Sequence, residues 1–557
     1  MAQLRRFALG LDFGTESVRA LVVACADGKE AAQAVVRYPH SVIATSLPGS
    51  KKPLPADFAL QDPRDYIDSS IKAIRQVLKR VKAADVVGIG VDFTACTILP
   101  VHRDGTPLMM EKGFRGDPHA WVKLWKHHAA QPEADRVNEL ARQRGEKFLQ
   151  YYSGSISSEW MLPKCWEIAK KSPQVYAAAE LIVDAGDWLV QQMTGTFCRN
   201  SCAAGYKGLW NAELGFPSEE FLTALDPALA GLRDKWLQNI VAPGELAGRV
   251  SEAFAQKSGL VTGTPVSAAT IDAHSGVAGM GVAGEGPMSI IMGTSSCHMV
   301  LSKELRFFEG FAGAVKDGII PGFYGYESGQ PAVGDIFGWF AQGFLKMPFA
   351  RLSKKAAALK PGAGGVLALD WMNGNRSVLM DSDLTGMLMG LTLRTKPEQV
   401  YRALIEATAF GTRMIVELYQ KGGVLIDELV VCGGLVKDPL IMQVYADVTG
   451  LPVKVAASSQ AVALGAAIFG ALAAGEQNGG YISAQDAIAK MTKSVLKTYR
   501  PAGNRDVYNE LYDLYRQAHD HFGRQNAALM KRLKEIATPC HSERSEESIE
   551  DSLLILR

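Results

Sequence analysis

An apolar run, a Gly-Thr turn and a second apolar run occur twice in the 557-residue chain, and this repeat constrains the fold more than any other feature. The first copy spans residues 7–24 and the second spans residues 286–302. Apolar and β-branched residues on both sides of a glycine-containing turn are typical of a β-hairpin. The repeat therefore predicts a duplicated chain in which each half opens with a hairpin. A chain of this length is also too long for one hydrophobic core, so two domains are expected.

Helical and strand patterns alternate around the two hairpins. Residues 63–82 carry apolar side chains at helical spacing behind a proline, and VVGIGVDF at 86–93 is typical of a buried strand. Residues 425–450 are typical of a strand, a Gly-Gly turn and a helix that begins at Asp438-Pro439. This alternation predicts the α/β class.

Charge and composition argue against several partners and locations. The 59 Lys and Arg nearly cancel the 58 Asp and Glu, which gives no reason to expect nucleic acid or an anionic membrane as a partner. The eight cysteines are scattered and show no paired CxxC spacing, which favours the reducing cytoplasm. The longest uncharged run, residues 461–475, is shorter than the roughly 20 residues of a membrane span and predicts a buried Ala/Gly-rich helix. The N-terminus does not have the pattern of a signal peptide, because Asp12 interrupts its apolar run.

The first hairpin turn offers the groups that phosphoryl transfer requires. They are an acid, a glycine that lets backbone amides approach phosphates, two hydroxyls and a cation on the next strand: Asp12, Gly14, Thr15, Ser17 and Arg19. A GxxxxGK[ST] loop is missing from the sequence, so ATP would bind through glycine turns of another architecture. Gly293, Gly433 and Gly434 are the candidates.

Five further polar residues admit a functional and an ordinary interpretation. Asp272 follows an apolar stretch and could be a general base, but the local sequence favours a helix cap. Lys207 and Glu327 lie in aromatic, glycine-containing segments that resemble sugar-binding loops, although a residue of either kind is more often an ordinary exposed charge. The adjacent His127 and His128 would point to different sides of a helix, which favours a solvent-exposed helical face over a metal site.

Taken together, these motifs resemble the FGGY carbohydrate kinases from about residue 5 to about residue 535. GMLMGLTLRTKPEQVYRALIEATAFG at 386–411 is similar to the second signature of the family, and VCGGLVKDPLIMQ at 431–443 to its adenosine-side turn. Other segments resemble the members that phosphorylate ribulose rather than xylulose or glycerol: VDFTACTILPV, DPHAWVKLWKHHAA, SCAAGYKGLW, TIDAHSG, YESGQPAVGD and LDWMNGNRS.

The resemblance implies two ribonuclease H-like domains of the actin-like ATPase class, each with a mixed sheet and flanking helices. They would span residues 1–285 and 286–538, with ATP and sugar in the cleft between them. The acidic segment 539–557 has no counterpart in the family and is expected to be a disordered tail. The implied reaction is ATP-dependent and Mg²⁺-dependent phosphorylation of the C5 hydroxyl of ribulose, with L-ribulose expected from arabinose catabolism. The oligomeric state stays open, with a homodimer as one arrangement.

The resemblance also implies a role for each candidate residue. Asp272 would be the catalytic base, and Asp12 would orient hydrated magnesium. The phosphates would be contacted by Gly14, Thr15, Ser17, Arg19, Gly293 and Thr294, and the adenosine would be bordered by Gly433, Gly434 and Lys437. The sugar pocket would be lined by Ala95, Lys207, Asp272 and Glu327, where Lys207 and Glu327 form hydrogen bonds and Ala95 leaves space.

Two alternatives compete with this function. The first is another kinase of the same family, acting on xylulose, rhamnulose, glycerol or a pentitol such as ribitol. The second is a sensor that binds sugar and nucleotide without catalysis, because one fold can serve unrelated functions. The presence of both Asp12 and Asp272 argues against the sensor.

Overall fold

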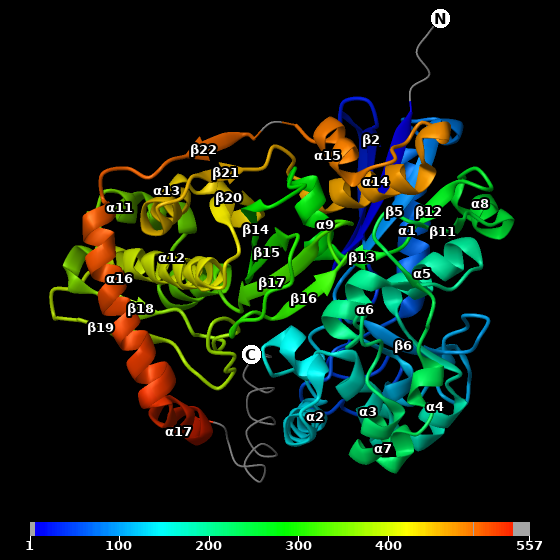
Figure 1. Ribbon diagram of the computed structural model, residues 1–557, viewed down its shortest axis with the longest axis horizontal. Coiled ribbons are helices and arrows are strands. Elements are labelled where there is room, and N and C mark those ends of the chain that lie inside the picture. Colours follow the sequence, from blue (N-terminus) through cyan, green and yellow to red (C-terminus); the bar gives the residue numbers. More distant parts are fainter. Residues whose placement is uncertain (1–5, 494, 538–557) are drawn as a thin grey trace, which may run out of the picture.

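Both predicted hairpins are present, and each starts a seven-stranded mixed sheet (Figure 1). The computed structural model describes residues 6–493 and 495–537. The first hairpin consists of β1 (Phe7–Phe13) and β2 (Ser17–Ala24). The second consists of β14 (Gly286–Met292) and β15 (Ser296–Ser302). The α/β class and the duplication predicted from the sequence are therefore confirmed.

The sheet of the N-terminal half has the strand order β11-β12-β5-β1-β2-β3, with β13 paired to β5 as well. β1 pairs antiparallel with β2 and parallel with β5. Because parallel strands need a crossover, the chain must cross over between β1 and β5. The remaining strands are β3 (Glu30–Arg37), β5 (Val86–Phe93), β11 (Leu246–Arg249), β12 (Pro265–Ser267) and β13 (Thr270–Ile271).

The sheet of the C-terminal half has the order β16-β17-β15-β14-β20-β21-β22. Its opening strand β14 is again antiparallel to the next strand and parallel to a distant one, β20. The two sheets therefore repeat one topology. The remaining strands are β16 (Gly313–Lys316), β17 (Tyr324–Gln330), β20 (Ile426–Cys432), β21 (Val453–Val455) and β22 (Lys497–Tyr499).

A helix from late in the chain covers the first sheet. α14 (Ala461–Ala474) is the Ala/Gly-rich segment, and it packs on β1, β5 and on α9 (Asp272–Gly279). In Figure 1 it lies beside the blue strands of the N-terminal half. A Cβ added at Gly90 would lie 1.7 Å from the carbonyl oxygen of Ala466, and one at Gly10 would lie 1.9 Å from that of Ala463. Strand glycines thus let the helix backbone rest directly on the strand backbone.

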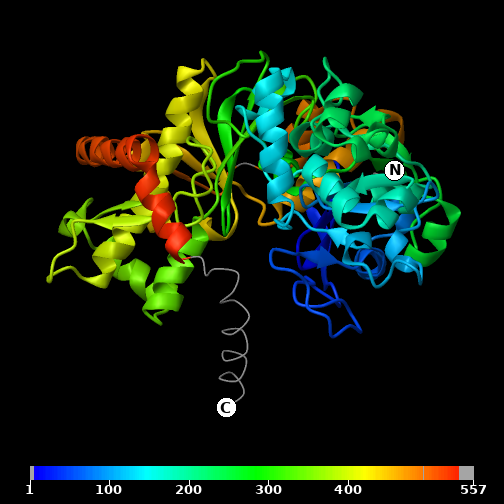
Figure 2. The same cartoon turned by 90° about the horizontal axis from the view of Figure 1, so that it is seen from below.

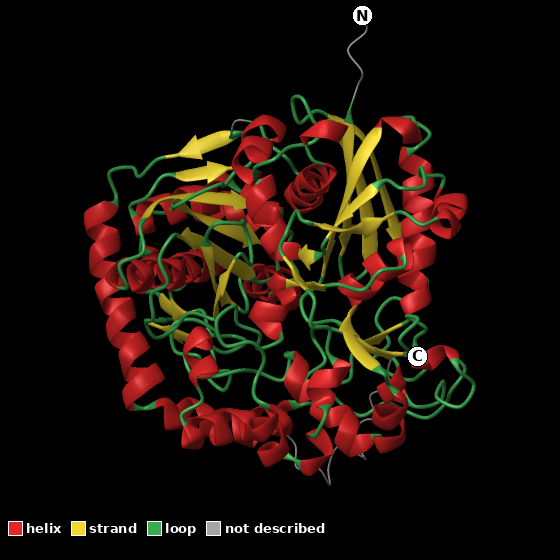
Figure 3. Cartoon of the chain, turned by 45° about the vertical axis from the view of Figure 1, so that its right-hand side comes forward, coloured by secondary structure: helices red, strands yellow, loops and turns green. Residues whose placement is uncertain are grey.

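The predicted helix boundaries follow local capping chemistry. α1 (Pro63–Val77) starts behind Asp62, whose side chain accepts a hydrogen bond from the Arg64 backbone N–H. α13 (Pro439–Thr449) starts behind Asp438 in the same way. The long helix α12 (Pro397–Lys421) crosses the C-terminal half next to α13. Figure 3 shows helices on both sides of the strands.

A separate subdomain projects from the N-terminal half, and Figure 2 shows it from below. Its four-stranded sheet has the order β4-β7-β6-β8 and an apolar core of its own. Its strands are β4 (Leu60–Gln61), β6 (Ile98–Val101), β7 (Val122–Lys123) and β8 (Leu181–Asp184), and its helices include α2 (Gln131–Arg144) and α3 (Met161–Lys171). After β8, α5 (Ala185–Thr194) packs on β5 and β11 of the first sheet, and α6 (Ser201–Lys207) contacts β13 and β16.

Two further predictions concern a membrane span and the C-terminal tail. In the part of the chain that the structure describes, none of the helices combines the length and the apolar character that a bilayer crossing requires. The predicted tail at residues 539–557 lies outside the described residues.

Candidate active site

Three carboxylates meet where strands of the first sheet end. Asp12 on β1 lies opposite Asp92 on the parallel strand β5. β13 runs parallel to β5 and pairs Thr270 with Asp92, so the chain reaches Asp272 just beyond the same edge. Ligands of open α/β sheets bind at the carboxyl ends of the strands, and the three acids occupy that place.

Asp12 is held by a cation on its own hairpin. Arg19 lies directly across from it on β2, and the guanidinium donates to Asp12 Oδ2 at 2.8 Å. The Asp12 side chain is 4% exposed, whereas that of Arg19 is 43% exposed. The guanidinium is therefore fixed by the acid, on a side chain that remains nearly half exposed.

Asp92 was not predicted from the sequence. Its side chain is fully buried, and neither of its carboxylate oxygens has a hydrogen-bond partner among the described residues. Burial raises its pKa well above the usual range, and the nearby Asp12 and Asp272 add to this rise. The signal that could have found it is the sequence GVDF at 90–93, which repeats the GLDF at 10–13.

Asp272 is the first residue of α9, and the helix-cap interpretation is wrong in that position. Ile271 occupies the cap, and Asp272 Oδ1 accepts a hydrogen bond from the neighbouring Ala273 N–H at 2.7 Å. The pKa of Asp272 is raised to about 7, mainly by burial and then by the charge of Asp12. A carboxyl with a pKa near neutrality is suited to general-base catalysis at physiological pH.

The carboxylate cluster has the donor chemistry of a magnesium site. Mg²⁺ prefers carboxylate and water oxygens, and the unpartnered oxygens of Asp92 are a reason to expect a cation close by. Within the described ranges, the only three acidic or histidine ligand groups within 4.8 Å of one another are His40, Asp62 and Asp65. Asp12, Asp92 and Asp272 are not all within that distance of one another.

Lys207 and Glu327 form a buried pair between the two halves. The ammonium of Lys207, at the end of α6, lies 3.3 Å and 3.2 Å from the two carboxylate oxygens of Glu327 on β17. Both residues are buried, so their interpretation as exposed charges is wrong. Burial opposes ionisation of Glu327, but Lys207 and His274 lower its pKa. Lys207 supplies a donor and Glu327 an acceptor at the junction of the two halves.

His274 and Trp160 complete the surroundings of this pair. His274 Nε2 lies 3.7 Å from Glu327 Oε2, and its ring stacks on Tyr206 with 4.2 Å between centroids. Burial lowers the pKa of His274 to about 4, so the ring is neutral at pH 7. The Lys207 ammonium lies 5.3 Å from the centre of the Trp160 ring. Aromatic surface beside a hydrogen-bonding pair is a suitable environment for a sugar.

A buried lysine that the sequence reasoning missed ties the loop of Ala95 to its neighbour. Lys164 on α3 donates to the carbonyl oxygen of Cys96 at 2.7 Å and to that of Leu124 at 2.9 Å. The next residue, Trp125, donates from its indole N–H to Thr15 Oγ1 at 3.1 Å. Lys164 thus ties the loop of Ala95 and Cys96 to the segment after β7 that contacts the first hairpin turn.

The second sheet brings its glycine turns together. Gly293 and Thr294 form the turn between β14 and β15, and the Gly334 N–H donates to the Gly293 carbonyl at 3.1 Å. Gly433 follows β20 with φ +106°, and a Cβ there would lie 2.3 Å from the Met292 carbonyl oxygen. Gly434 and Lys437 continue from it in an exposed turn. No hydrogen bond or ion pair joins the 433–437 turn to the three carboxylates in the described residues.

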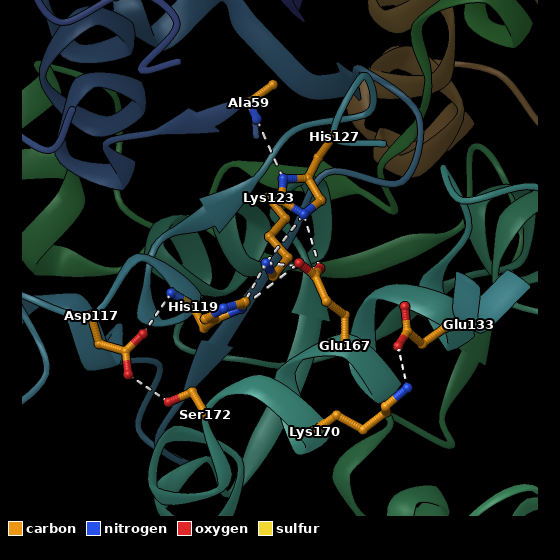
Figure 4. Close-up of polar contacts among 9 residues, drawn as sticks. All are labelled: Ala59, Asp117, His119, Lys123, His127, Glu133, Glu167, Lys170 and Ser172. Carbon is orange, nitrogen blue, oxygen red and sulfur yellow. Dashed lines mark hydrogen bonds and ion pairs between the residues drawn. The ribbon is translucent and has the colours of Figure 1, made fainter. Parts of the chain in front are cut away.

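A buried charge cluster in the subdomain corrects the interpretation of the histidine pair (Figure 4). Lys123 on β7 lies 3.0 Å from Glu167 on α3, and His127 Nε2 lies 2.9 Å from the same carboxylate. The Ala59 N–H donates to His127 Nδ1 at 3.3 Å. His127 is fully buried in a loop, so the expected exposed helical face is wrong. Burial and then Lys123 lower its pKa to about 3, which makes it a neutral link in the core.

The sequence matches two parts of one enzyme family. Residues 7–279 match the FGGY family of carbohydrate kinases, N-terminal domain, and residues 288–474 match the C-terminal domain of the same family. The ribulokinase of Bacillus licheniformis is 50% identical over 537 residues, which cover 93% of this chain and 97% of that protein. The ribulokinase of Geobacillus thermodenitrificans is 49% identical over 547 residues, with 95% and 97% covered.

Solved structures support the fold. The xylulose kinase of Rhodospirillum rubrum aligns with a TM-score of 0.76 at 21% identity and covers 93% of this chain and 99% of that one. The gluconate kinase of Lactobacillus acidophilus aligns with a TM-score of 0.79 at 17% identity, with 94% and 100% covered. At these identities the likeness concerns the arrangement of the chain.

Proposed function

The chain belongs to the FGGY family of carbohydrate kinases, and we propose that it transfers the γ-phosphate of ATP to the C5 hydroxyl of ribulose, with L-ribulose as the preferred sugar. About half of its residues are identical to those of proteins named ribulokinase, over nearly the whole length of both chains. The product is ribulose 5-phosphate. The proposed domain boundary lies near residue 286, between α9 and β14.

One observation carries the proposal. Asp272, with a pKa raised to about 7, lies close enough to both Asp12 and Glu327 for their charges to contribute to that rise. Asp12 belongs to the hairpin turn proposed for phosphate, and Glu327 belongs to the Lys207–Glu327 pair proposed for sugar. A base between a phosphate site and a sugar site is what a sugar kinase requires.

The proposed mechanism begins with the sugar hydroxyl. Asp272 in its ionised form accepts the proton of the C5 hydroxyl as that oxygen attacks the γ-phosphorus. The proton stays on the carboxyl, while the bond between the γ-phosphorus and the bridging oxygen of ADP breaks. A hydroxyl oxygen that loses its proton during attack is a better nucleophile, and such help contributes about 10²- to 10⁴-fold to the rate.

The phosphates would be bound from both hairpin turns. Backbone N–H groups near Gly14 and Gly293 and the hydroxyls of Thr15, Ser17 and Thr294 would donate to phosphate oxygens, together with the accessible guanidinium of Arg19. Preorganised donors stabilise the charge on the phosphoryl oxygens in the transition state. Magnesium, bound through water by Asp12 and next to Asp92, would supply positive charge to the phosphates.

The sugar and the nucleoside would use the two remaining clusters. Lys207 would donate to a sugar oxygen and Glu327 would accept from a sugar hydroxyl, while Ala95 leaves space for the carbon chain. The adenosine would be bordered at the end of β20 by Gly433, Gly434 and Lys437.

We also propose a cytoplasmic location, because the seven cysteines of the described residues are free thiols: Cys25, Cys96, Cys165, Cys198, Cys202, Cys297 and Cys432.

The test is ATP-dependent ADP release with L-ribulose, D-ribulose, D-xylulose, L-rhamnulose and glycerol. We expect the highest kcat/KM with L-ribulose. A preference for another of these sugars would replace the substrate. Binding of ATP and sugar without turnover of any of them would contradict the proposed activity and favour a sensor.

A further inference from the structure

The loop that carries the LDWMNGNRS motif at 369–377 has no role in the mechanism above, yet it is firmly built. Asn375 Oδ1 accepts from the Leu379 N–H at 2.9 Å, and Asn375 and Asp381 exchange backbone hydrogen bonds of 2.8 Å in both directions. Ser377 Oγ accepts from the Gly329 N–H on β17 at 3.2 Å. These bonds fix Arg376, between Asn375 and Ser377, against β17.

The Arg376 side chain lies beside Gly329 of β17. Alternate residues of a strand lie on one face, so Gly329 shares the face of Glu327. A Cβ at Gly329 would lie 3.6 Å from Cδ and 3.8 Å from a terminal nitrogen of Arg376. The arginine side chain therefore runs across β17 on the side that carries the sugar-pocket carboxylate.

The guanidinium of Arg376 has donors to spare. Its nearest charged partner is Glu159, with 3.6 Å between Nη2 and Oε1, which is too long for a strong hydrogen bond. It makes no hydrogen bond to any residue within 6–493 or 495–537. The Arg376 side chain is 32% exposed. A guanidinium has five N–H donors in a planar fork, so this one can bind a ligand oxygen without giving up an existing bond.

The partner Glu159 belongs to the opposite half of the molecule. It directly precedes Trp160, whose ring lies 5.3 Å from the Lys207 ammonium. Arg376 therefore reaches the same pocket as Lys207, but from the C-terminal half. Glu159, Cys297 and Glu327 are the groups whose charges act most on Arg376, whereas Asp12 and Glu327 are the side chains that act most on Asp272. Glu327 is common to both sets, and the geometry agrees: His274, two residues after Asp272, lies 3.7 Å from Glu327 Oε2, and Arg376 runs along the face of β17 that carries Glu327.

We propose that Arg376 is a specificity-determining residue that donates to the carbonyl oxygen at C2 of the ketose. The assignment rests on the proposed function, in which the C5 hydroxyl lies at Asp272. A five-carbon chain that starts at the base and passes Glu327 presents its carbonyl end to Arg376. Because the donor comes from the C-terminal half while Lys207 comes from the N-terminal half, the bound ketose connects the two.

The test compares L-ribulose with ribitol, its alcohol analogue at C2, in the wild type and in Arg376→Met. Methionine keeps most of the apolar stem and removes all donors. Because a site built to hydrogen-bond a polar group loses discrimination when the donor is removed, we expect kcat/KM for L-ribulose to fall about 10- to 100-fold, mainly through KM. The kcat/KM for ribitol should fall less, so the ratio of kcat/KM for L-ribulose to kcat/KM for ribitol should decrease roughly tenfold. The KM for ATP should stay within about twofold.

Glu159→Gln is the matched control, because it removes the ionic partner of Arg376 and leaves the guanidinium. It should keep the wild-type preference between the two sugars. If Arg376→Met lowers the melting temperature, Arg376→Lys takes its place, with a smaller change in the same direction. An Arg376 variant whose sugar KM stays within about twofold of the wild type, or that loses both sugars equally, overturns the proposal. A wild type that phosphorylates no ketose overturns the proposed function itself, which is a separate result.

Discussion

The two halves of the molecule contain sheets of the same topology, but they differ in the side chains at the strand ends where the first sheet carries its acids. The paths β3-β2-β1-β5-β12-β11 and β17-β15-β14-β20-β21-β22 agree in order and in the direction of every pairing. Asp12 and Asp92 are paired two residues before the first turn, and the corresponding pair in the second sheet is Ile291 and Cys432. The topology fixes where strand ends meet, and the side chains at those ends decide what each half can bind.

The hairpin turns themselves are more alike than the residues beside them. The Gly14 N–H donates to the Ser17 carbonyl at 3.0 Å, and the Gly293 N–H donates to the Ser295 carbonyl at 2.9 Å. Both turns have a glycine followed by a threonine. In the proposed function, both halves would therefore supply backbone donors for phosphate, while the acids proposed to hold the cation and accept the proton, Asp12 and Asp272, belong to the first half.

The largest effect is expected for Asp272→Asn, which would remove the base and keep the shape of the acidic half. We expect kcat to fall about 10³-fold with little change in the KM for ATP, because proton removal matters in the transition state. Steady-state kinetics with saturating ATP measure this. Asp427→Asn, an exposed acid on β20 of the other half, is the control and should retain wild-type kcat. Equal kcat values for Asp272→Asn and the wild type would contradict the role of Asp272 as the base and, with it, the proposed functional difference between the halves.

The pair that joins the halves gives the next largest effect. Lys207→Ala should raise the KM for ribulose about 50-fold, because Glu327 would then be a buried charge that has lost its closest cation. Lys170→Ala is closely matched, since the Lys170 ammonium also lies 5.3 Å from a tryptophan ring and pairs with an acid, Glu133, at 2.7 Å. Its ammonium pairs with Glu133 (Figure 4) and not with Glu327, so this variant should leave the KM for ribulose unchanged. Similar KM values for both variants would remove Lys207 from the sugar site.

The pH profile should depend on the acidic half alone. The carboxyl of Asp272 has a pKa of about 7 and acts in its deprotonated form, so activity is present above that pKa and is lost as pH falls through it. We expect kcat/KM to fall about 30-fold from pH 8 to pH 5.5. Cys432, at the matching strand end, has its pKa raised to about 12 by burial and stays neutral over this range. A flat profile over this range would contradict the assignment.

The smallest effect is expected for a glycine turn of the C-terminal half. Gly433→Ala places a Cβ 2.3 Å from the Met292 carbonyl oxygen at a positive φ, so the turn must shift. We expect the KM for ATP to rise about tenfold while the KM for ribulose changes little. Gly503→Ala, where a Cβ would have open space, is the control. A rise in the ribulose KM instead would assign this turn to the sugar.

The sequence predicted features that local pattern determines. The two hairpins, the cap at Asp438 and the buried helix at 461–474 depend on residues close together in the chain, and all three are present. Asp92, Lys164 and the burial of His127 were missed, since each depends on partners far along the chain. Glu167, for example, lies 40 residues from His127. A charged residue looks exposed in a sequence until a distant partner is known.

The position of α14 has a consequence for the order in which the protein can be made. The strands β1 and β5 emerge from the ribosome early, but the helix that rests on their glycines is more than 350 residues downstream of both. During synthesis the face of the first sheet stays uncovered until nearly the whole chain has been translated. Contacts of such long sequence separation slow folding and leave an apolar surface open to aggregation in the meantime. A chain truncated before residue 461 would therefore leave its first half, and the acids that half carries, without a finished support.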